Sequence, residues 1–207
     1  MNPWWHLLID LGIILILMIG IRQFRTARGA RAGNLIAALA LLGALGAVLF
    51  RNPILAPAVV ACALVVGGGL GWAVAVRVNM IQIPAMVAFQ HGAGGVAAFL
   101  VSFVELTRDA AALTTVGRAS GILGIVVGAA TFSGSMIASG KLASLLKQTP
   151  TVLPRHDWIL LATTLGVAVL GALASHTSGV VLAGLLLVLI LFSIVLGVIF
   201  SIRIGGA

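Results

Sequence analysis

Long apolar stretches alternate with short polar ones along the whole chain. Each stretch extends for about 17 residues or more, and a helix needs roughly 20 residues to cross the ~30 Å hydrocarbon layer of a bilayer. The strict alternation of apolar and polar residues that marks the strands of a membrane barrel is absent. The pattern therefore predicts an all-α, polytopic transmembrane helix bundle of about seven helices, at residues 5–21, 34–50, 54–76, 80–104, 116–141, 158–174 and 179–202.

The composition agrees with a membrane setting. Of the 207 residues, 61% are hydrophobic and 8% are charged, whereas about 25% of the residues of a soluble domain are charged. The longest polar connections, at 23–33 and 142–157, are too short to hold a globular domain. We therefore expect residues 1–207 to form a single transmembrane domain, with no soluble nucleotide-binding domain in this chain.

The net charge of +8 reflects membrane topology and does not indicate a nucleic-acid partner, because the basic residues lie between the apolar stretches or at their edges. The opposite side carries Arg51, Arg108 and Arg118, with Glu105 and Asp109 partly offsetting them. The positive-inside rule then predicts an outside N-terminus and a cytoplasmic C-terminus. Nine of the twelve basic residues lie on the side predicted to be cytoplasmic: Arg22, Arg25, Arg28, Arg31, Arg77, Lys141, Lys147, Arg155 and Arg203.

His91 is the main candidate for chemistry. It lies in "MVAFQHGAGGVAAF" (86–99), among apolar and glycine residues, and its distance of about eleven residues from Met80 places it ~16 Å deep, near the bilayer centre. Hydrocarbon disfavours the imidazolium form, so we expect a neutral ring that takes up a proton when water reaches it. Such a group can relay protons. The alternative is a histidine that hydrogen-bonds between helices for stability.

Small residues accompany this histidine on two predicted helices. The segment "GAGGVA" (92–97) matches a dinucleotide-binding fingerprint, but it continues a long apolar run and follows no strand, so we interpret it as helix packing. On the next helix a stripe at steps of three or four residues changes from glycines to hydroxyls, which suits close packing followed by hydrogen bonding or water binding. The alternative is packing alone, with the hydroxyls bonded to carbonyls of their own helix. The stripe consists of Gly117, Gly121, Gly124, Gly128, Thr131, Ser135 and Ser139.

The remaining polar residues have ordinary interpretations. His6 and Asp10 are four residues apart and could pair near the outer interface, and Cys62 is expected to be a small buried apolar residue. Glu105, Arg108 and Asp109 form a solvated cluster, while His156 and His176 lie in short connections. No spacing of histidines and carboxylates suggests a metal site, and none is expected.

Four motifs, in the same order along the chain, resemble the membrane domain of the proton-translocating NAD(P) transhydrogenase beta subunit. "MIQIPAMVAFQHGAGGVAA" (80–98) is similar to M-T-D-M-P-x-M-V-A-x-x-(H/N)-G-x-G-G, and "TFSGSMIASGKL" (131–142) to F-T-G-S-x-I-A-F-G-K-L. "LPRH" (153–156) and "RAGN" (31–34) also have counterparts. "SIRIGGA" (201–207) looks like the hinge that precedes a further helix in that family.

The resemblance implies a function for the chain and roles for three residues. His91 would be the proton relay, and Thr131 and Ser135 would organise water. Proton passage would be coupled to hydride transfer between NAD(H) and NADP(H), both held on partner domains, so this chain binds no cofactor itself and should not catalyse hydride transfer alone. The implied setting is the bacterial plasma (inner) membrane, with lipid around the helices and other transhydrogenase subunits in an oligomeric, dimeric complex.

The sequence departs from the family pattern at several positions. Ile81 and Gln82 replace the usual threonine and acidic residue, so a charged cytoplasmic entrance to the channel does not carry over. Ser133 and Ser139 replace a threonine and a bulky aromatic residue. Two alternatives stay open at this point: a self-contained proton or ion channel or transporter without nucleotide partners, and a structural subunit in which His91 only packs.

Overall fold

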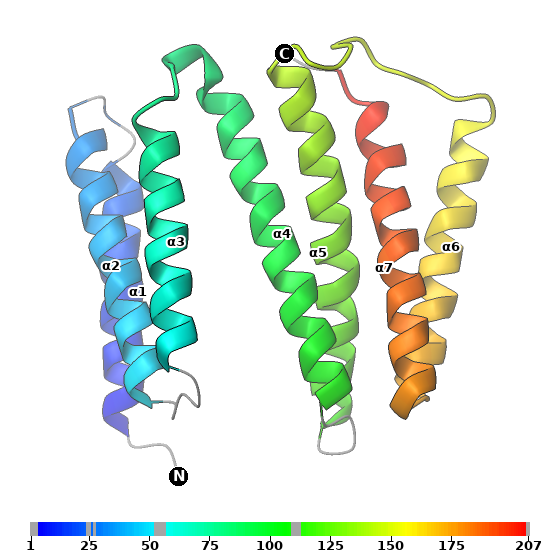
Figure 1. Ribbon diagram of the computed structural model, residues 1–207, viewed down its shortest axis with the longest axis horizontal. Helices are drawn as coiled ribbons and strands as arrows, with labels where there is room; N and C mark the ends of the chain where they lie inside the picture. The colour runs from blue at the N-terminus through cyan, green and yellow to red at the C-terminus, as the bar shows by residue number, and fades with distance from the viewer. Residues whose placement is uncertain (1–3, 24–25, 27, 52–56, 109–112, 206–207) are drawn as a thin grey trace. The chain divides into compact units, whose positions relative to one another are not determined.

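The computed structural model describes residues 4–23, 26, 28–51, 57–108 and 113–205. Over these ranges the chain forms seven α-helices and one 3-10 turn, and no strand occurs in them (Figure 1). The all-α prediction is therefore confirmed. The elements are α1 (Trp4–Gln23), α2 (Ala30–Arg51), α3 (Pro57–Ala75), η1 (Met80–Gln82), α4 (Ile83–Arg108), α5 (Thr115–Leu142), α6 (His156–Ser175) and α7 (Gly179–Ile202).

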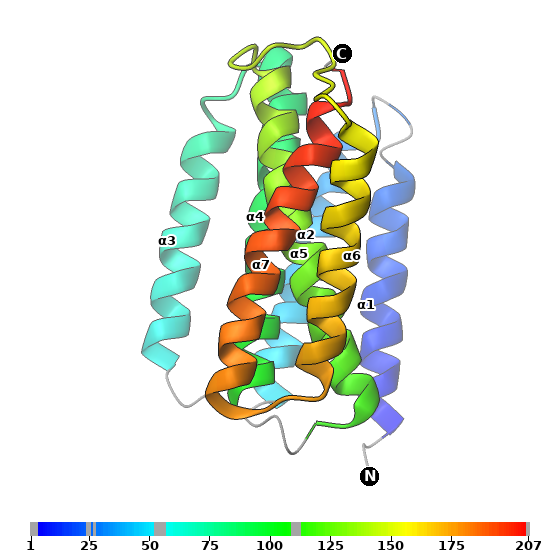
Figure 2. The ribbon, with the colours of Figure 1, turned by 90° about the vertical axis from the view of Figure 1, so that its right-hand side faces the viewer.

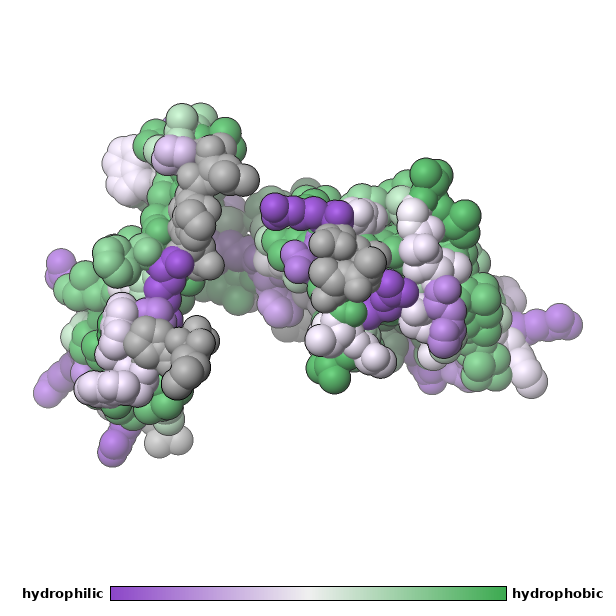
Figure 3. All heavy atoms as spheres, turned by 90° about the horizontal axis from the view of Figure 1, so that it is seen from below, coloured by the Kyte–Doolittle hydropathy of each residue, from purple (hydrophilic) through white to green (hydrophobic). Residues whose placement is uncertain are grey.

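Each of the seven α-helices found in the described ranges is long and apolar enough to cross a membrane. Viewed from the end where α4 ends and α5 begins, hydrophilic residues lie among the helix ends and hydrophobic residues cover much of the visible flanks (Figure 3). This is the distribution that a bilayer requires, because its core cannot solvate charged groups. The chain is a multi-pass membrane protein.

The helix boundaries differ from the predicted ones mainly where polar residues continue a helix beyond its apolar part. α2 begins at Ala30 rather than at residue 34, and α4 continues to Arg108. The fourth predicted helix instead begins with the 3-10 turn Met80–Gln82, in which the Gln82 side chain accepts a hydrogen bond from the Asn79 N–H (3.2 Å). The predicted start of the third helix, at residues 54–56, lies outside the described residues.

By its internal contacts the chain divides into two units, Met1–Ala73 and Val74–Ala207, and each is described by itself. The expected single domain stays a prediction. In the first unit α1 packs against α2 through glycine: a Cβ atom at Gly33 would lie 2.6 Å from the Gly20 carbonyl oxygen. α3 buries none of its residues in the part of the chain described.

In the second unit α5 is the central helix. It packs against α4, α6 and α7, and α7 in turn contacts α6 and α4 (Figures 1 and 2). The apolar core fills the half of this unit where α5 begins, since its members come from the end of α4, the start of α5, the end of α6 and the start of α7. They are Leu106, Ile122, Ile125, Val167, Ala174, Leu182, Leu186 and Leu189.

Two basic residues fix α5 to the ends of its neighbours. Near its start, Arg118 Nη1 donates to the carbonyl oxygens of Ser175 (2.9 Å) and Thr177 (3.2 Å), where α6 ends. Near its end, buried Lys141 donates to the carbonyl oxygens of Ser201, Ile202 and Ile204, where α7 ends. A cation at a helix C-terminus satisfies carbonyls that have no intrahelical partner and complements the helix dipole.

Replacing Lys141 by methionine is expected to lower the free energy of unfolding by about 1–3 kcal/mol, because a charged donor shared by three carbonyl oxygens at the end of α7 is lost. Methionine keeps the length and most of the apolar volume of the lysine stem. The matched control is Lys147→Met, because Lys147 is exposed in the following connection. SDS titration of the purified protein would measure both changes, and equal stability of the two variants would contradict a structural role for the Lys141 ammonium.

Candidate functional site

The candidate site is built around His91 on α4. This residue lies eight positions after the start of α4 at Ile83 and seventeen before its end at Arg108, about 12 and 25 Å along the axis. Its side chain is exposed on the surface of this unit, and among the described residues it takes part in no hydrogen bond or ion pair. The ring nitrogens are therefore available to water or to a further protein segment.

One cavity of about 610 Å³ extends from His91 toward the end of α5. Its α5 wall begins at Ala130 and reaches Ala138, and the opposite walls come from the first half of α6 and the last part of α7. Serine and threonine residues join His91 among its polar lining residues. The lining residues are His91, Ala130, Thr131, Gly134, Ser135, Ala138, Leu160, Thr164, Leu196, Gly197, Phe200, Ser201 and Ile204.

A second cavity of about 420 Å³ begins at the same histidine and extends in the opposite direction along α5. Its walls are mostly glycine and alanine, from α4 after His91 and from α5 before Thr131. They consist of Gln90, His91, Gly94, Gly95, Ala98, Gly124, Val127, Gly128 and Thr131. His91 and Thr131 are thus the two side chains that line both cavities.

The glycines on α4 and α5 bring these two helices into backbone contact. A Cβ atom at Gly95 would lie 2.6 Å from the Gly128 carbonyl oxygen, and one at Gly128 would lie 2.7 Å from the Phe99 nitrogen. Real Cβ atoms do not approach so closely, so both positions require glycine for this spacing. The interpretation as helix packing is thus supported for Gly92, Gly95, Gly121, Gly124 and Gly128, whereas a Cβ atom at Gly94 would meet nothing within 4 Å and one at Gly117 would meet only Thr114 and Leu113.

The hydroxyls of the α5 stripe fall into two groups. Ser139 Oγ donates to the Ala85 carbonyl oxygen of α4 (2.8 Å), so it joins the two helices. Thr131 and Ser135 are half-buried in the cavity wall and make no hydrogen bond within the described part of the chain. Within the α5 stripe, this second pair can offer its hydroxyls to water beside His91.

Two further hydroxyls of the larger cavity come from other helices, and the sequence did not single them out. Thr164 of α6 and Ser201 of α7 both line it. Thr164 Oγ1 already donates to the Leu160 carbonyl oxygen (2.8 Å), which leaves the oxygen as an acceptor. Neither residue shares a helix with His91 or with the α5 stripe, so spacing along the sequence does not connect them to the site. Only the packing of α5 against α6 and α7 brings them there.

His156 lies at a different place from the predicted one. It is the first residue of α6 rather than part of a connection, and it is 3% exposed. Its Nδ1 accepts a hydrogen bond from the Leu153 N–H (3.4 Å), while its buried Nε2 has no partner among the described residues. His176 lies in the turn between α6 and α7, as predicted.

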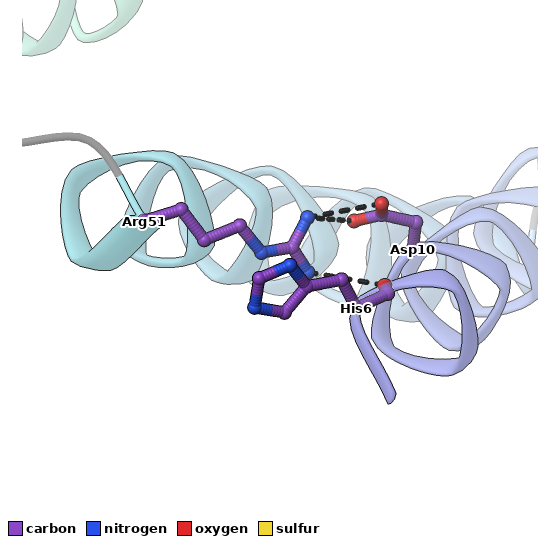
Figure 4. A network of polar contacts seen from close by, with 3 residues as sticks. All are labelled: His6, Asp10 and Arg51. Atoms are coloured by element: carbon purple, nitrogen blue, oxygen red, sulfur yellow. Dashed lines mark hydrogen bonds and ion pairs between the residues drawn. The ribbon is translucent and has the colours of Figure 1, made fainter. Parts of the chain in front are cut away.

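The first unit contains a polar network between α1 and α2 (Figure 4). Arg51 Nη1 contacts both carboxylate oxygens of Asp10, at 2.8 and 2.9 Å, and Arg51 Nη2 donates to the His6 carbonyl oxygen at 3.1 Å. Asp10 therefore pairs with Arg51 and not with the His6 ring. That ring packs edge-on against Trp5, with centroids 3.8 Å apart.

This ion pair should couple the two helices energetically. We expect Asp10→Leu and Arg51→Leu each to destabilise the protein, and the double variant to be more stable than the sum of the two losses predicts, because each single change leaves one charge unpaired. The expected coupling is about 0.5–3 kcal/mol. A double-mutant cycle in SDS titrations measures it, and additive losses would show that the pair contributes nothing.

The other polar residues discussed from the sequence make few contacts in the structure. Glu105 and Arg108 form no ion pair with each other in the described residues, and Asp109 and Arg25 lie outside them. Cys62 is exposed rather than buried, because α3 packs little of its surface. Within the described ranges no group of three or more histidine, cysteine or acidic residues could hold a metal ion.

Fold and site together define a multi-pass helical membrane protein with a titratable side chain between two cavities. The family model for the NAD(P) transhydrogenase beta subunit matches residues 7–207. The chain belongs to this family.

Two curated relatives are similar to this chain, both named NAD(P) transhydrogenase subunit beta. One is from Rhodospirillum rubrum and the other from a designated strain of that species. Each is 34% identical over 152 residues, which cover 69% of this chain and 32% of the relative. The chain thus spans about a third of the length of these relatives.

Proposed function

We propose that this chain is the membrane proton-translocating part of an NAD(P) transhydrogenase. Proton passage through it is coupled to hydride transfer between NAD(H) and NADP(H) on partner domains. The observation that carries the proposal is the position of His91, which lines two cavities that extend in opposite directions along α5. A group at the junction of two such spaces can receive a proton from one and release it into the other.

His91 is the proton relay in this proposal, and Thr131 and Ser135 organise water around it. Thr131 lines both cavities, so its hydroxyl can contact water on either side of the imidazole. Ser135 lies one turn further along the larger cavity. A hydroxyl both donates and accepts hydrogen bonds, so it can orient a water molecule in either direction of transfer.

Coupling requires that the membrane part has two conformational states. Proton binding and nucleotide binding must each shift the equilibrium between them. The α4–α5 contact suits a small shift between such states, because backbone meets backbone directly at Gly95 and Gly128. The longest connection between described helices, Ala143 to Arg155 between α5 and α6, has 13 residues and cannot hold a nucleotide-binding domain. The chain alone is therefore not expected to catalyse hydride transfer.

The membrane and the orientation that we propose rest on the distribution of basic residues and on the family. The excess of basic residues on one side supports an outside N-terminus and a cytoplasmic C-terminus in a bacterial plasma (inner) membrane. Lipid surrounds the helices, and other transhydrogenase subunits complete a dimeric complex. The alternative of a self-contained channel or transporter is not favoured, because the family match covers nearly the whole chain.

Purification of the chain from its native membrane tests the proposal. We expect chains that bind NAD(H) and NADP(H) to copurify, and vesicles containing the whole complex to move protons when NADPH and NAD⁺ are added together. Vesicles containing this chain alone should show no such nucleotide-driven movement. A homo-oligomer of this chain that conducts protons without any nucleotide-binding partner would contradict the assignment.

A further inference from the structure

A surface cavity unrelated to His91 lies where α2 begins. Its volume is about 610 Å³, and all of its lining residues belong to the first unit. Its lining combines two arginines and one asparagine with alanine and leucine residues. The residues are Arg28, Arg31, Ala32, Asn34, Leu35 and Ala38.

The packing of α2 directs this cavity away from α1. Gly33 and Ala40 are buried, and Gly33 is in backbone contact with Gly20 of α1. At 100° per residue, Arg31, Leu35 and Ala38 fall on the opposite side of the helix from Gly33 and Ala40. These three residues are exposed, and the face that they form lies on the side of α2 opposite to α1.

The two arginines have no protein counter-charge within this unit. Neither Arg28 nor Arg31 forms an ion pair in the described residues, and Asp10 is the one acidic residue in Met1–Ala73. Asp10 is bound to Arg51 at the far end of α2, about 30 Å of helix from Arg31. An anion from outside this unit must therefore balance these charges, or water alone must solvate them.

The cavity also changes from charged to apolar along the helix axis. Arg28 and Arg31 lie at the start of α2, Asn34 follows, and Leu35 and Ala38 lie up to seven residues, or about 10 Å, further into the membrane-spanning helix. An inorganic anion would use only the charged end. A molecule with an anionic head and a hydrocarbon tail fits both ends.

We propose that this cavity binds an anionic phospholipid of the leaflet at the turn between α1 and α2. The phosphate group lies between Arg28 and Arg31, with Asn34 as an additional hydrogen-bond donor, and an acyl chain lies along Leu35 and Ala38. Arginine is suited to this role because its planar fork binds two phosphate oxygens at once. The site is independent of the proton path, since it shares no residue with either cavity at His91.

The test is native mass spectrometry of the complex after exchange into nanodiscs of phosphatidylcholine and phosphatidylglycerol at 3:1. We expect the wild-type protein to retain phosphatidylglycerol in preference to phosphatidylcholine. The double variant Arg28→Gln/Arg31→Gln should lose roughly tenfold or more of that preference, because each arginine near an anionic surface contributes about fivefold. Leu35→Asn should weaken retention without any change of charge.

A matched variant distinguishes a built site from general attraction to the basic side. Arg22→Gln/Arg77→Gln removes the same charge from two exposed arginines outside the cavity and should keep the preference for phosphatidylglycerol. An equal loss in this control would overturn the proposal, as would an unchanged double variant. Displacement of phosphatidylglycerol by millimolar inorganic phosphate would also overturn it, because the ligand would then be a free anion.

Discussion

Replacement of His91 by asparagine is expected to lower nucleotide-driven proton movement by at least about a hundredfold, the scale of a lost acid–base group. Asparagine preserves polarity and hydrogen bonding at this position but cannot exchange a proton with water. His91 is the titratable side chain shared by the two cavities, so nothing else at their junction can substitute for it. Proton uptake by vesicles containing the whole complex measures the change.

The matched control for this experiment is His176→Asn. His176 is exposed in the turn between α6 and α7 and lines neither cavity, so proton movement should keep its wild-type rate. Both variants should unfold at the wild-type temperature, because His91 makes no hydrogen bond within the described residues. Wild-type proton movement in His91→Asn would show that the histidine only packs.

Replacement of Gly128 by alanine is expected to destabilise the protein by about 1–3 kcal/mol, the usual cost of forcing an extra carbon into a close contact. The new Cβ atom would lie 2.7 Å from the Phe99 nitrogen and 2.8 Å from the Gly95 carbonyl oxygen. Backbone atoms cannot rotate away, so α4 and α5 must separate. SDS titration measures the loss, and proton movement should fall with it because both helices line the cavities at His91.

The control for Gly128 should change stability in the opposite direction. A Cβ atom at Gly184 on α7 would have no neighbour within 4 Å, so Gly184→Ala adds helix propensity without a clash. We expect it to be neutral or stabilising by up to about 1 kcal/mol. If Gly128→Ala stabilised the protein as much as Gly184→Ala does, the close contact between α4 and α5 would be wrong.

The sequence predicted the helices well, because a bilayer imposes a minimum length and an apolar composition on every crossing. The last helix was predicted at its observed bounds, 179–202. The errors in the predicted bounds lie at helix ends, where the bilayer no longer imposes this composition. Ala30 to Gly33 extend α2 at a polar edge, and Met80 to Gln82 form a 3-10 turn. At those edges local capping decides the structure, and hydropathy does not report it.

Less of the site could be predicted. The glycine stripe and His91 followed from spacing along single helices, whereas the cavity walls from α6 and α7 depend on how helices pack. Lys141 and Arg51 were interpreted as topology signals, yet both bind partners more than forty residues away. A charge count along the chain gives the side of the membrane but not the partner.

Proton passage as proposed requires that water reach His91 from both sides of the membrane, and thiol accessibility measures this. In a Cys62→Ser background, His91→Cys in the whole complex would be treated with a small, charged methanethiosulfonate reagent added to one side of the vesicle at a time. Ile125→Cys, at a fully buried core position, is the unreactive control. We expect labelling at position 91 from either side; protection from both sides, at the level of the Ile125→Cys control, would show that His91 is not on a water-accessible path.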